Sequence, residues 1–180
     1  KENSINSNQL IEDYLVGRVT FYVSGPLWKK SFLNNQNELF DENLSNLDDW
    51  DFNLRMLYQK PSMAFIDRPL IKYRVHKNSL SNEIGKLNIK EIKSEFNARE
   101  KHLKLIRSNN KANFKILQNS NLEQYRFILR EAMVTNNMNK KYFFKHLFLK
   151  QLEAFVVKQA FRTFIVFFIY RVFKKGYRFL

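Results

Sequence analysis

The sequence predicts an α/β fold, with a few strands and helices in residues 1–82 and a mostly helical extension in residues 83–180. Three observations predict it. Short runs of β-branched and aromatic residues, bounded by turn residues, lie in the first part. Apolar residues at helical spacing lie in the second part. All three prolines and two of the four glycines also fall in the first part.

The first part is expected to hold three strands and two helices. Its strands comprise residues 19–23, 63–67 and 70–75. A short helix or turn follows the first strand at residues 27–33, and residues 40–46 are irregular. The longer helix can be capped by Asp48 or Asp49 and runs to about Tyr58, because Trp50, Leu54 and Leu57 recur at helical spacing.

The second part is expected to be helical as far as about residue 140. The apolar positions at helical spacing are Ile89, Ile92, Phe96, Leu103 and Ile106. Breaks are expected at residues 109–110 and 119–121, and residues 122–134 are expected to form another helix.

The charge of the chain is distributed unevenly. Residues 1–82 carry ten basic and ten acidic side chains, whereas residues 83–180 carry 21 basic and seven acidic ones, so the whole formal net charge of +14 lies in the second part. This asymmetry indicates that the second part meets an anionic surface, either nucleic acid or phospholipid. Cysteine is absent, which excludes disulfides and thiolate metal sites and fits a reducing compartment.

The tail, residues 142–180, holds thirteen Phe or Tyr residues, eight Lys or Arg residues and one acid. Its longest charge-free stretch has eight residues, too short for a spanning helix of about 20. If the tail is one helix, Arg171, Lys174, Lys175 and Arg178 share a face, as membrane-contact residues would. Apolar residues nearly encircle that helix, however. Two interpretations stay open: a helix on an anionic membrane, and a helix docked in the protein's own core.

The candidate catalytic residues of the first part are an acidic pair. Asp48 and Asp49 lie at the start of the predicted helix, where the helix dipole favours an ionised carboxylate that can accept a proton. Arg74, His76 and Lys77 follow the last predicted strand and could meet a phosphate-bearing group. A carboxylate base beside a phosphate clamp suits sugar transfer from a nucleotide diphosphate.

These residues resemble the C-terminal half of a family 2 glycosyltransferase, an inverting enzyme of the GT-A fold. The resemblance covers about residues 10–82. The matching features, in order, are Ser24 to Lys30, Phe40-Asp41-Glu42, Asp48-Asp49-Trp50, and Tyr73-Arg74-Val75-His76 with Ser79. It implies an incomplete GT-A-type sheet in residues 1–82, which would form the acceptor and base part of the catalytic domain.

The resemblance also implies roles for single residues. Asp49 would be the general base, Asp48 the first member of the acidic pair, and Trp50 and Trp28 part of the acceptor wall. Arg74, His76 and Lys77 would lie on the diphosphate side, and His76 could approach a metal. The complete enzyme would use a divalent metal, Mn or Mg, a nucleotide-sugar donor and a glycan or lipid-linked acceptor. We expect a role in bacterial cell-surface polysaccharide synthesis, and lipopolysaccharide and glycoprotein pathways stay open.

The donor-binding half of that family, with its Asp-x-Asp metal motif, has no counterpart before residue 19. We therefore expect a fragment that does not transfer sugar alone. The alternative is a non-catalytic basic module that binds membrane or nucleic acid, although the charge-neutral first part argues against nucleic acid. The expected location is cytoplasmic, peripheral on the inner face of the membrane.

Neighbouring residues are expected to have structural roles. Arg55 is expected to be an ion-pair partner, and Asp41 and Glu42 to form hydrogen bonds within a turn. His102 and His146 have no carboxylate or histidine at ligand spacing in the sequence, so we expect them to be solvated or interfacial.

Overall fold

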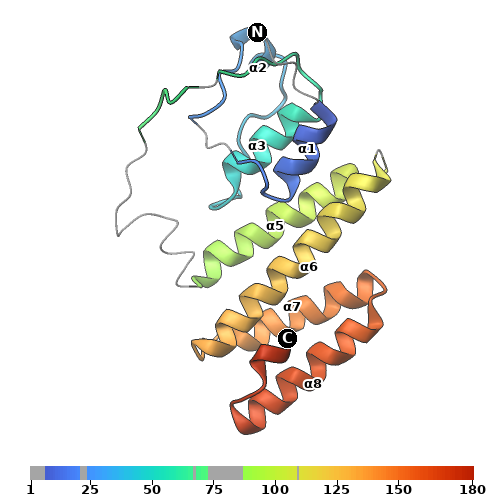
Figure 1. The fold of residues 1–180 in the computed structure, drawn as a ribbon. Coiled ribbons are helices and arrows are strands. Elements are labelled where there is room, and N and C mark those ends of the chain that lie inside the picture. Colours follow the sequence, from blue (N-terminus) through green and yellow to red (C-terminus); the bar gives the residue numbers. More distant parts are fainter. Residues whose placement is uncertain (1–6, 21–23, 67, 73–86, 109) are drawn as a thin grey trace. The chain divides into compact units, whose positions relative to one another are not determined.

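The computed structural model describes residues 7–20, 24–66, 68–72, 87–108 and 110–180 (Figure 1). All regular secondary structure in these ranges is helical, and they contain no strand. The predicted α/β fold with its GT-A-type sheet is therefore wrong.

The fold class was mispredicted because short runs of β-branched and aromatic residues were interpreted as strands. Residues 63–66 and 70–72 are irregular, and all of them except the half-buried Met63 are exposed, with Phe65 at 67% and Leu70 at 61%. A strand pairs its backbone groups only with a neighbouring strand, and β-propensity depends strongly on that context. The described residues offer no such neighbour, whereas a helix satisfies its own backbone. Residues 21–23, 67 and 73–75, the rest of the predicted strands, lie outside the described residues.

The chain divides into two compact units, residues 1–116 and residues 117–180. The division falls inside helix α6, Lys111–Val134. It differs in position from the functional boundary expected between residues 82 and 83, which stays a prediction.

The first unit contains α1 (Ser7–Leu15), α2 (Lys30–Leu33), α3 (Asp48–Leu57) and α5 (Ile89–Ile106). Helix α3 packs against both α1 and α5. The short helix expected within residues 27–33 and the helix after the acidic pair are confirmed, whereas α1 was not foreseen. The buried apolar residues that join these helices include Ile11, Leu15, Leu54, Leu57, Ile92 and Phe96.

Helix α3 begins differently from the prediction. Its N-cap is Leu47, with a left-handed φ of 61° and no side-chain cap hydrogen bond. Asp48 and Asp49 instead occupy the first turn, together with Asp51. Three carboxylates thus lie where unpaired backbone N–H groups and the helix dipole favour negative charge.

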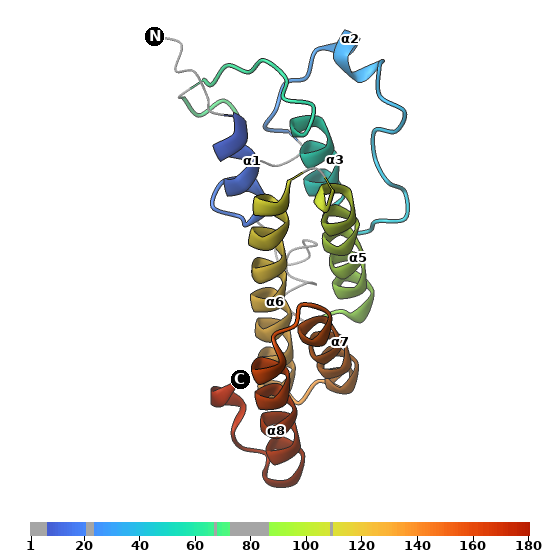
Figure 2. The same ribbon diagram turned by 90° about the vertical axis from the view of Figure 1, so that its right-hand side faces the viewer.

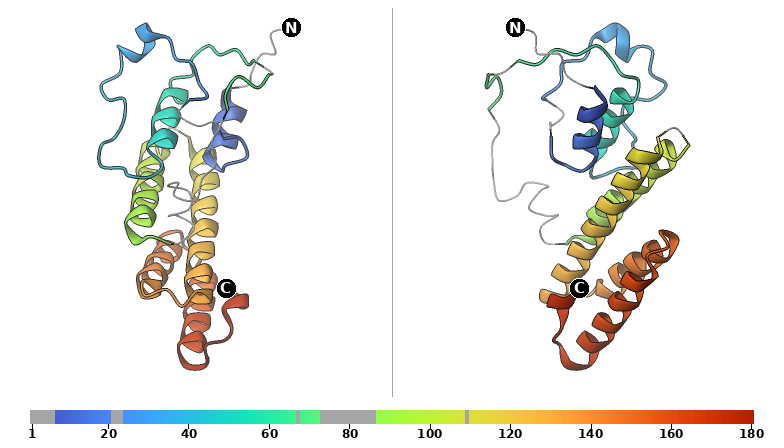
Figure 3. Two further views of the ribbon diagram at one scale, coloured as in Figure 1. Left: turned by 90° about the vertical axis from the view of Figure 1, so that its left-hand side faces the viewer. Right: turned by 45° about the vertical axis from the view of Figure 1, so that its right-hand side comes forward.

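The second unit contains the C-terminal part of α6, α7 (Lys140–Glu153), α8 (Val157–Phe173) and the short 3₁₀ helix η1 (Tyr177–Phe179). Figures 2 and 3 show α7 and α8 running side by side in opposite directions. The end predicted at residue 134 is confirmed. The break predicted at residues 119–121 is wrong, because Asn121 is buried in the middle of α6.

The tail is not one helix. It bends at residues 154–156, where Phe155 has a φ of 58°, and α8 ends before Lys174, a C-cap with a φ of 56°. Of the four proposed membrane-contact residues, only Arg171 lies in α8. Lys175 follows the helix and Arg178 lies in η1, so the shared helical face predicted for them is wrong, although all four are exposed.

None of the helices that the structure describes combines the length and the apolar character that crossing a membrane requires.

Candidate functional site

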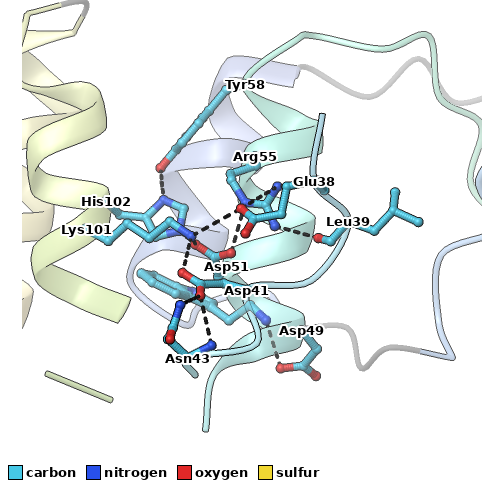
Figure 4. A network of polar contacts seen from close by, with 11 residues as sticks. Glu38, Leu39, Asp41, Asn43, Asp49, Asp51, Arg55, Tyr58, Lys101 and His102 are labelled. Atoms are coloured by element: carbon cyan, nitrogen blue, oxygen red, sulfur yellow. Dashed lines mark hydrogen bonds and ion pairs between the residues drawn. The ribbon is translucent and has the colours of Figure 1, made fainter. Parts of the chain in front are cut away.

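A buried carboxylate, Asp51, organises the polar centre of the first unit (Figure 4). Its Oδ1 lies 3.0 Å from His102 Nε2 and 2.9 Å from Lys101 Nζ, both on α5. Its Oδ2 accepts a hydrogen bond of 2.9 Å from Nε of Arg55, one turn later on α3. Asp51 therefore links α3 to α5 through two nitrogen groups of α5 and is also held by Arg55 of its own helix.

The same cations hold the irregular segment before α3. Lys101 Nζ donates to Asp41 Oδ2 at 2.8 Å. Arg55 donates to the backbone oxygens of Glu38 at 2.8 Å and Leu39 at 2.5 Å. The predicted structural role of Arg55 is thus confirmed. Because guanidinium presents several fixed donors, a single side chain can fix a turn to a helix.

Asp41 also has the role expected from the sequence. Its Oδ1 accepts hydrogen bonds from the backbone N–H and the side-chain amide of Asn43, at 3.0 and 3.1 Å. The hydrogen bond from Lys101, helped by those from Asn43, holds the pKa of Asp41 below its usual value. The turn around residues 40–43 is therefore closed by an ionised carboxylate.

The network keeps Asp51 ionised although it is buried. Burial by itself would raise its pKa, but the hydrogen bonds from His102, Lys101 and Arg55 outweigh that effect and hold the pKa well below its usual value. Burial alone would lower the pKa of Lys101, and its hydrogen bonds to Asp41 and Asp51 raise it instead. These groups remain a charged cluster at neutral pH.

His102 connects this cluster to Tyr58. Its Nδ1 lies 2.8 Å from the Tyr58 hydroxyl. Burial lowers the pKa of His102 despite the neighbouring carboxylate, and two cations beside Asp51 oppose a third positive charge. We therefore assign neutral imidazole, with Nε2–H donating to Asp51 and Nδ1 accepting from Tyr58. The sequence-based expectation of a solvated or interfacial His102 is wrong.

This chain of groups resembles a proton relay, but it is closed to substrates. The side chains of Asp51 and His102 both have 0% exposure. A catalytic group has to reach a reacting atom within hydrogen-bond distance. The Asp51 network therefore holds the structure together and does not meet a substrate directly.

A second contact joins the segment before α3 to α5. Ser94 Oγ accepts hydrogen bonds from the backbone N–H groups of Ser45 and Asn46, at 2.9 and 3.0 Å, and donates to the Asn46 carbonyl at 3.1 Å. Ser94 and Asn46 are both buried. The residues that lead into α3 are thus held in place up to the acidic pair.

The proposed base, Asp49, lies on another side of α3 from the network. At 100° per residue it is about 200° around the helix from Asp51, and Figure 4 shows it apart from the side chains around Asp51. Its Oδ1 accepts the Trp50 backbone N–H at 2.8 Å. Both Asp48 and Asp49 are partly exposed. Burial and, more weakly, the charge of Asp49 raise the pKa of the Tyr14 hydroxyl.

The two tryptophans proposed for the acceptor wall both pack against protein. Trp50 donates from Nε1 to the Tyr14 carbonyl at 3.2 Å, and its ring lies 4.7 Å from the His102 ring and 5.7 Å from the Arg99 guanidinium carbon. The role of Trp50 in binding an acceptor stays a prediction.

Trp28 belongs to a separate aromatic cluster. Its ring stacks on Phe32 at 5.5 Å and meets the edge of Phe52 at 6.1 Å. Phe52 in turn stacks on Phe40 at 4.7 Å. The cluster therefore connects the residues around Trp28 to the turn that carries Phe40.

The predicted diphosphate side, Arg74, His76 and Lys77, lies outside the described residues. So does the possible metal ligand, because that is also His76. Within the described part of the chain, no three His, Asp or Glu side chains are grouped to hold a metal. The divalent metal that the resemblance implies therefore stays a prediction.

A hollow of about 550 Å³ borders the turn that Arg55 and Lys101 hold. Glu38, Leu39, Phe40, Glu42 and Asn43 line it. Two acidic residues, an amide and an aromatic ring line this hollow, and Arg55 and Lys101 lie 4.0 Å from the Glu38 carboxylate. Such a lining can form hydrogen bonds with the hydroxyl groups of a ligand.

Sequence reasoning missed His102 and Ser94. Asp51 and His102 are 51 residues apart, so no local spacing links them. One signal was available. His102 lies on the apolar stripe of α5 that includes Ile92 and Ile106, and a polar residue at a core position needs a buried partner.

Comparison with known protein families, with curated proteins and with solved structures finds no match for this chain. The likeness to family 2 glycosyltransferases therefore stays a hypothesis that rests on the residues quoted above.

Proposed function

We propose that this chain supplies the acceptor side and the general base of an inverting sugar transferase, and that the donor-binding part is supplied by other residues. The observation that carries the proposal is the first turn of α3. There Asp49 is a partly exposed carboxylate at a helix N-terminus, on a different side of the helix from the buried network.

In this proposal Asp49 takes the proton from an acceptor hydroxyl. The hydroxyl oxygen forms a bond to the anomeric carbon of the donor sugar on the face opposite the diphosphate. The bond between that carbon and the diphosphate oxygen breaks, and the diphosphate leaves with the electron pair. Arg74, His76 and Lys77 would neutralise the charge that develops on it.

Two features support this role: the surroundings of Asp49 are held rigidly, and its carboxylate is partly exposed to solvent. The Asp51 network and the Ser94 contact fix both the turn before α3 and the helix itself. A base held by such neighbours keeps its position relative to a bound hydroxyl, which contributes strongly to rate. Asp49 has this rigid support without being buried within it.

We propose that part of a long acceptor, away from its reacting hydroxyl, lies in the hollow beside Phe40. Glu42 and Asn43 would accept and donate hydrogen bonds to sugar hydroxyls, and Phe40 would pack against a sugar C–H face.

The test is sugar transfer in extracts of cells that produce the chain together with its natural partners. Labelled UDP- and GDP-sugars are supplied, and label is counted in the lipid and polymer fractions. Asp49→Asn is expected to lower transfer by about 10²-fold or more, the usual contribution of a general base. Lys104→Gln, an exposed change on α5, is the control and is expected to retain transfer. Undiminished transfer by Asp49→Asn would refute the proposal.

A further inference from the structure

One side of helix α8 is apolar and exposed. The residues that form it are Val157, Phe161, Phe164, Ile165, Phe168 and Val172, with exposures between 39% and 65%. At 100° per residue they fall within an arc of about 100°. We call these six residues the outer face of α8.

The opposite side of α8 is already used by the protein. Ala160, Thr163, Val166, Phe167 and Tyr170 are all buried, with exposures of at most 6%. Phe167 stacks on Phe144 of α7 at 4.2 Å, and Tyr170 donates a 2.7 Å hydrogen bond to the Met133 carbonyl of α6. Packing within the second unit therefore accounts for one side of the helix. On the outer face, Phe164 also lies near Phe144 and Phe148 of α7, with ring centroids 6.4 and 6.3 Å apart, yet it is 49% exposed.

Cations border the outer face. Lys158 and Arg162 flank it along one edge and Arg171 along the other, and all three are exposed. Residues 154–180 contain six Lys or Arg side chains and no Asp or Glu. A large exposed apolar surface marks an interaction site, and this one is surrounded by a single sign of charge.

We propose that the outer face of α8 docks on an anionic lipid surface. The aromatic rings would enter the boundary between headgroups and acyl chains, while the flanking Lys and Arg stems extend toward phosphate. Because α8 lies in the plane of the surface in this arrangement, it does not need the length of a spanning helix. This inference does not rest on the proposed transferase activity.

A second copy of the chain fits the outer face less well. Bringing two such faces together would also bring two sets of cations together with no acid between them. Like charges at that distance oppose association, whereas anionic headgroups attract the same cations. The charge around the face therefore favours lipid over self-association.

The test uses the full chain and sedimentation with vesicles of phosphatidylcholine, with or without phosphatidylglycerol. Binding to the anionic vesicles is expected to be at least about tenfold stronger than to the neutral ones, and to fall when NaCl is raised from about 0.1 to 0.5 M. No binding to anionic vesicles, or equal binding to both kinds, would overturn the proposal.

Matched variants locate the surface. Phe161→Ser with Phe168→Ser is expected to weaken anionic-vesicle binding by at least about tenfold. Phe65→Ser with Phe127→Ser removes two comparably exposed rings outside the outer face and is expected to change binding less than about twofold. Equal effects of these variants would overturn the assignment of the face, and an unchanged circular dichroism spectrum shows that each variant is folded.

Charge variants test the flanking cations separately. Lys158→Gln with Arg171→Gln is expected to weaken binding by at least about fivefold. Lys104→Gln with Lys115→Gln removes the same charge from exposed positions elsewhere and serves as the control. If both pairs weaken binding equally, only net charge matters and the proposed face is wrong.

Insertion is measured with a new fluorophore. Phe168→Trp is expected to be quenched by brominated lipids, and Phe127→Trp is not, each compared with the wild type that contains Trp28 and Trp50. Equal quenching at both positions contradicts the proposal. So does a dimer in analytical ultracentrifugation that is lost with Phe161→Ser and Phe168→Ser, since the face would then bind a second copy.

Discussion

Replacing Asp51 with Asn should destabilise the first unit far more than the same change at Asp48. The two side chains have nearly equal size and lie in the same turn of α3. They differ in surroundings, because Asp51 has 0% side-chain exposure and three charged or polar donors, whereas Asp48 is partly exposed. The comparison isolates the buried network from the general effect of a carboxylate at a helix start.

The expected size follows from what Asp51→Asn leaves behind. The new amide would place N–H groups opposite Nε of Arg55 or Nζ of Lys101, and both cations would lose a charged partner at 2.9 Å. Breaking a buried ion pair costs about 3–5 kcal/mol. Arg55 and Lys101 keep their other acceptors and are 16% and 27% exposed, so the lower end, about 3 kcal/mol, is expected. Asp48→Asn loses only a helix-dipole interaction of about 0.3–1 kcal/mol.

Urea unfolding followed by tryptophan fluorescence is the assay. Trp28 and Trp50 both lie in the first unit, so the signal reports that unit alone. The pH dependence gives a second check. Since the folded pKa of Asp51 is lowered, its stabilisation is present above the unfolded value of about 3.9 and is lost as the pH falls below it. Asp51→Asn should remove that acid loss. Equal free energies of unfolding for Asp51→Asn and Asp48→Asn would refute the reasoning.

Three further outcomes follow from single contacts. Burial, helped by the charge of Lys150, lowers the pKa of His146 to about 4, so histidine NMR should show neutral imidazole at pH 5. The second unit should then lose stability as the pH falls from about 6.5 toward 4. A measured pKa near the ordinary histidine value would contradict this. Ser94→Ala leaves the backbone N–H groups of Ser45 and Asn46 without their acceptor and should lower the free energy of urea unfolding by about 2 kcal/mol. A loss below about 0.5 kcal/mol would mean that these N–H groups find other acceptors. Tyr170→Phe should cost about 1 kcal/mol in thermal unfolding, because it removes the hydrogen bond to Met133, and an unchanged melting temperature would show that this bond adds no net stability.

Local patterns identified the helices better than the fold class. The helix that carries the acidic pair was predictable because Leu54 and Leu57 recur at helical spacing and both are buried. The strands were not, because β-branched runs form strands only beside a partner, and that partner is not a property of the run itself. Phe65 and Ile66 show the result, since both are exposed in an irregular segment.

In the candidate site, too, contacts within one helix could be predicted and contacts between helices could not. The ion pair of Asp51 with Arg55 is one helical turn apart, and the structural role of Arg55 could be foreseen from the sequence. The partners from α5 could not, because Lys101 and His102 reach Asp51 only through the packing of two helices 50 residues apart along the chain. The tail was also only partly predictable. Apolar residues lie on nearly all sides of α8 because one side packs inside the second unit while another is apolar and exposed.

The most direct test of the proposed base is the initial rate of sugar transfer as a function of pH, for wild type and Asp49→Asn in extracts of cells that produce the chain with its natural partners. If Asp49 accepts the proton, the wild-type rate falls at acid pH as this carboxylate is protonated, and Asp49→Asn loses about 10²-fold or more of the rate together with that acid limb. Its urea midpoint should stay close to that of the wild type. An Asp49→Asn enzyme with the wild-type rate and pH profile would contradict the account.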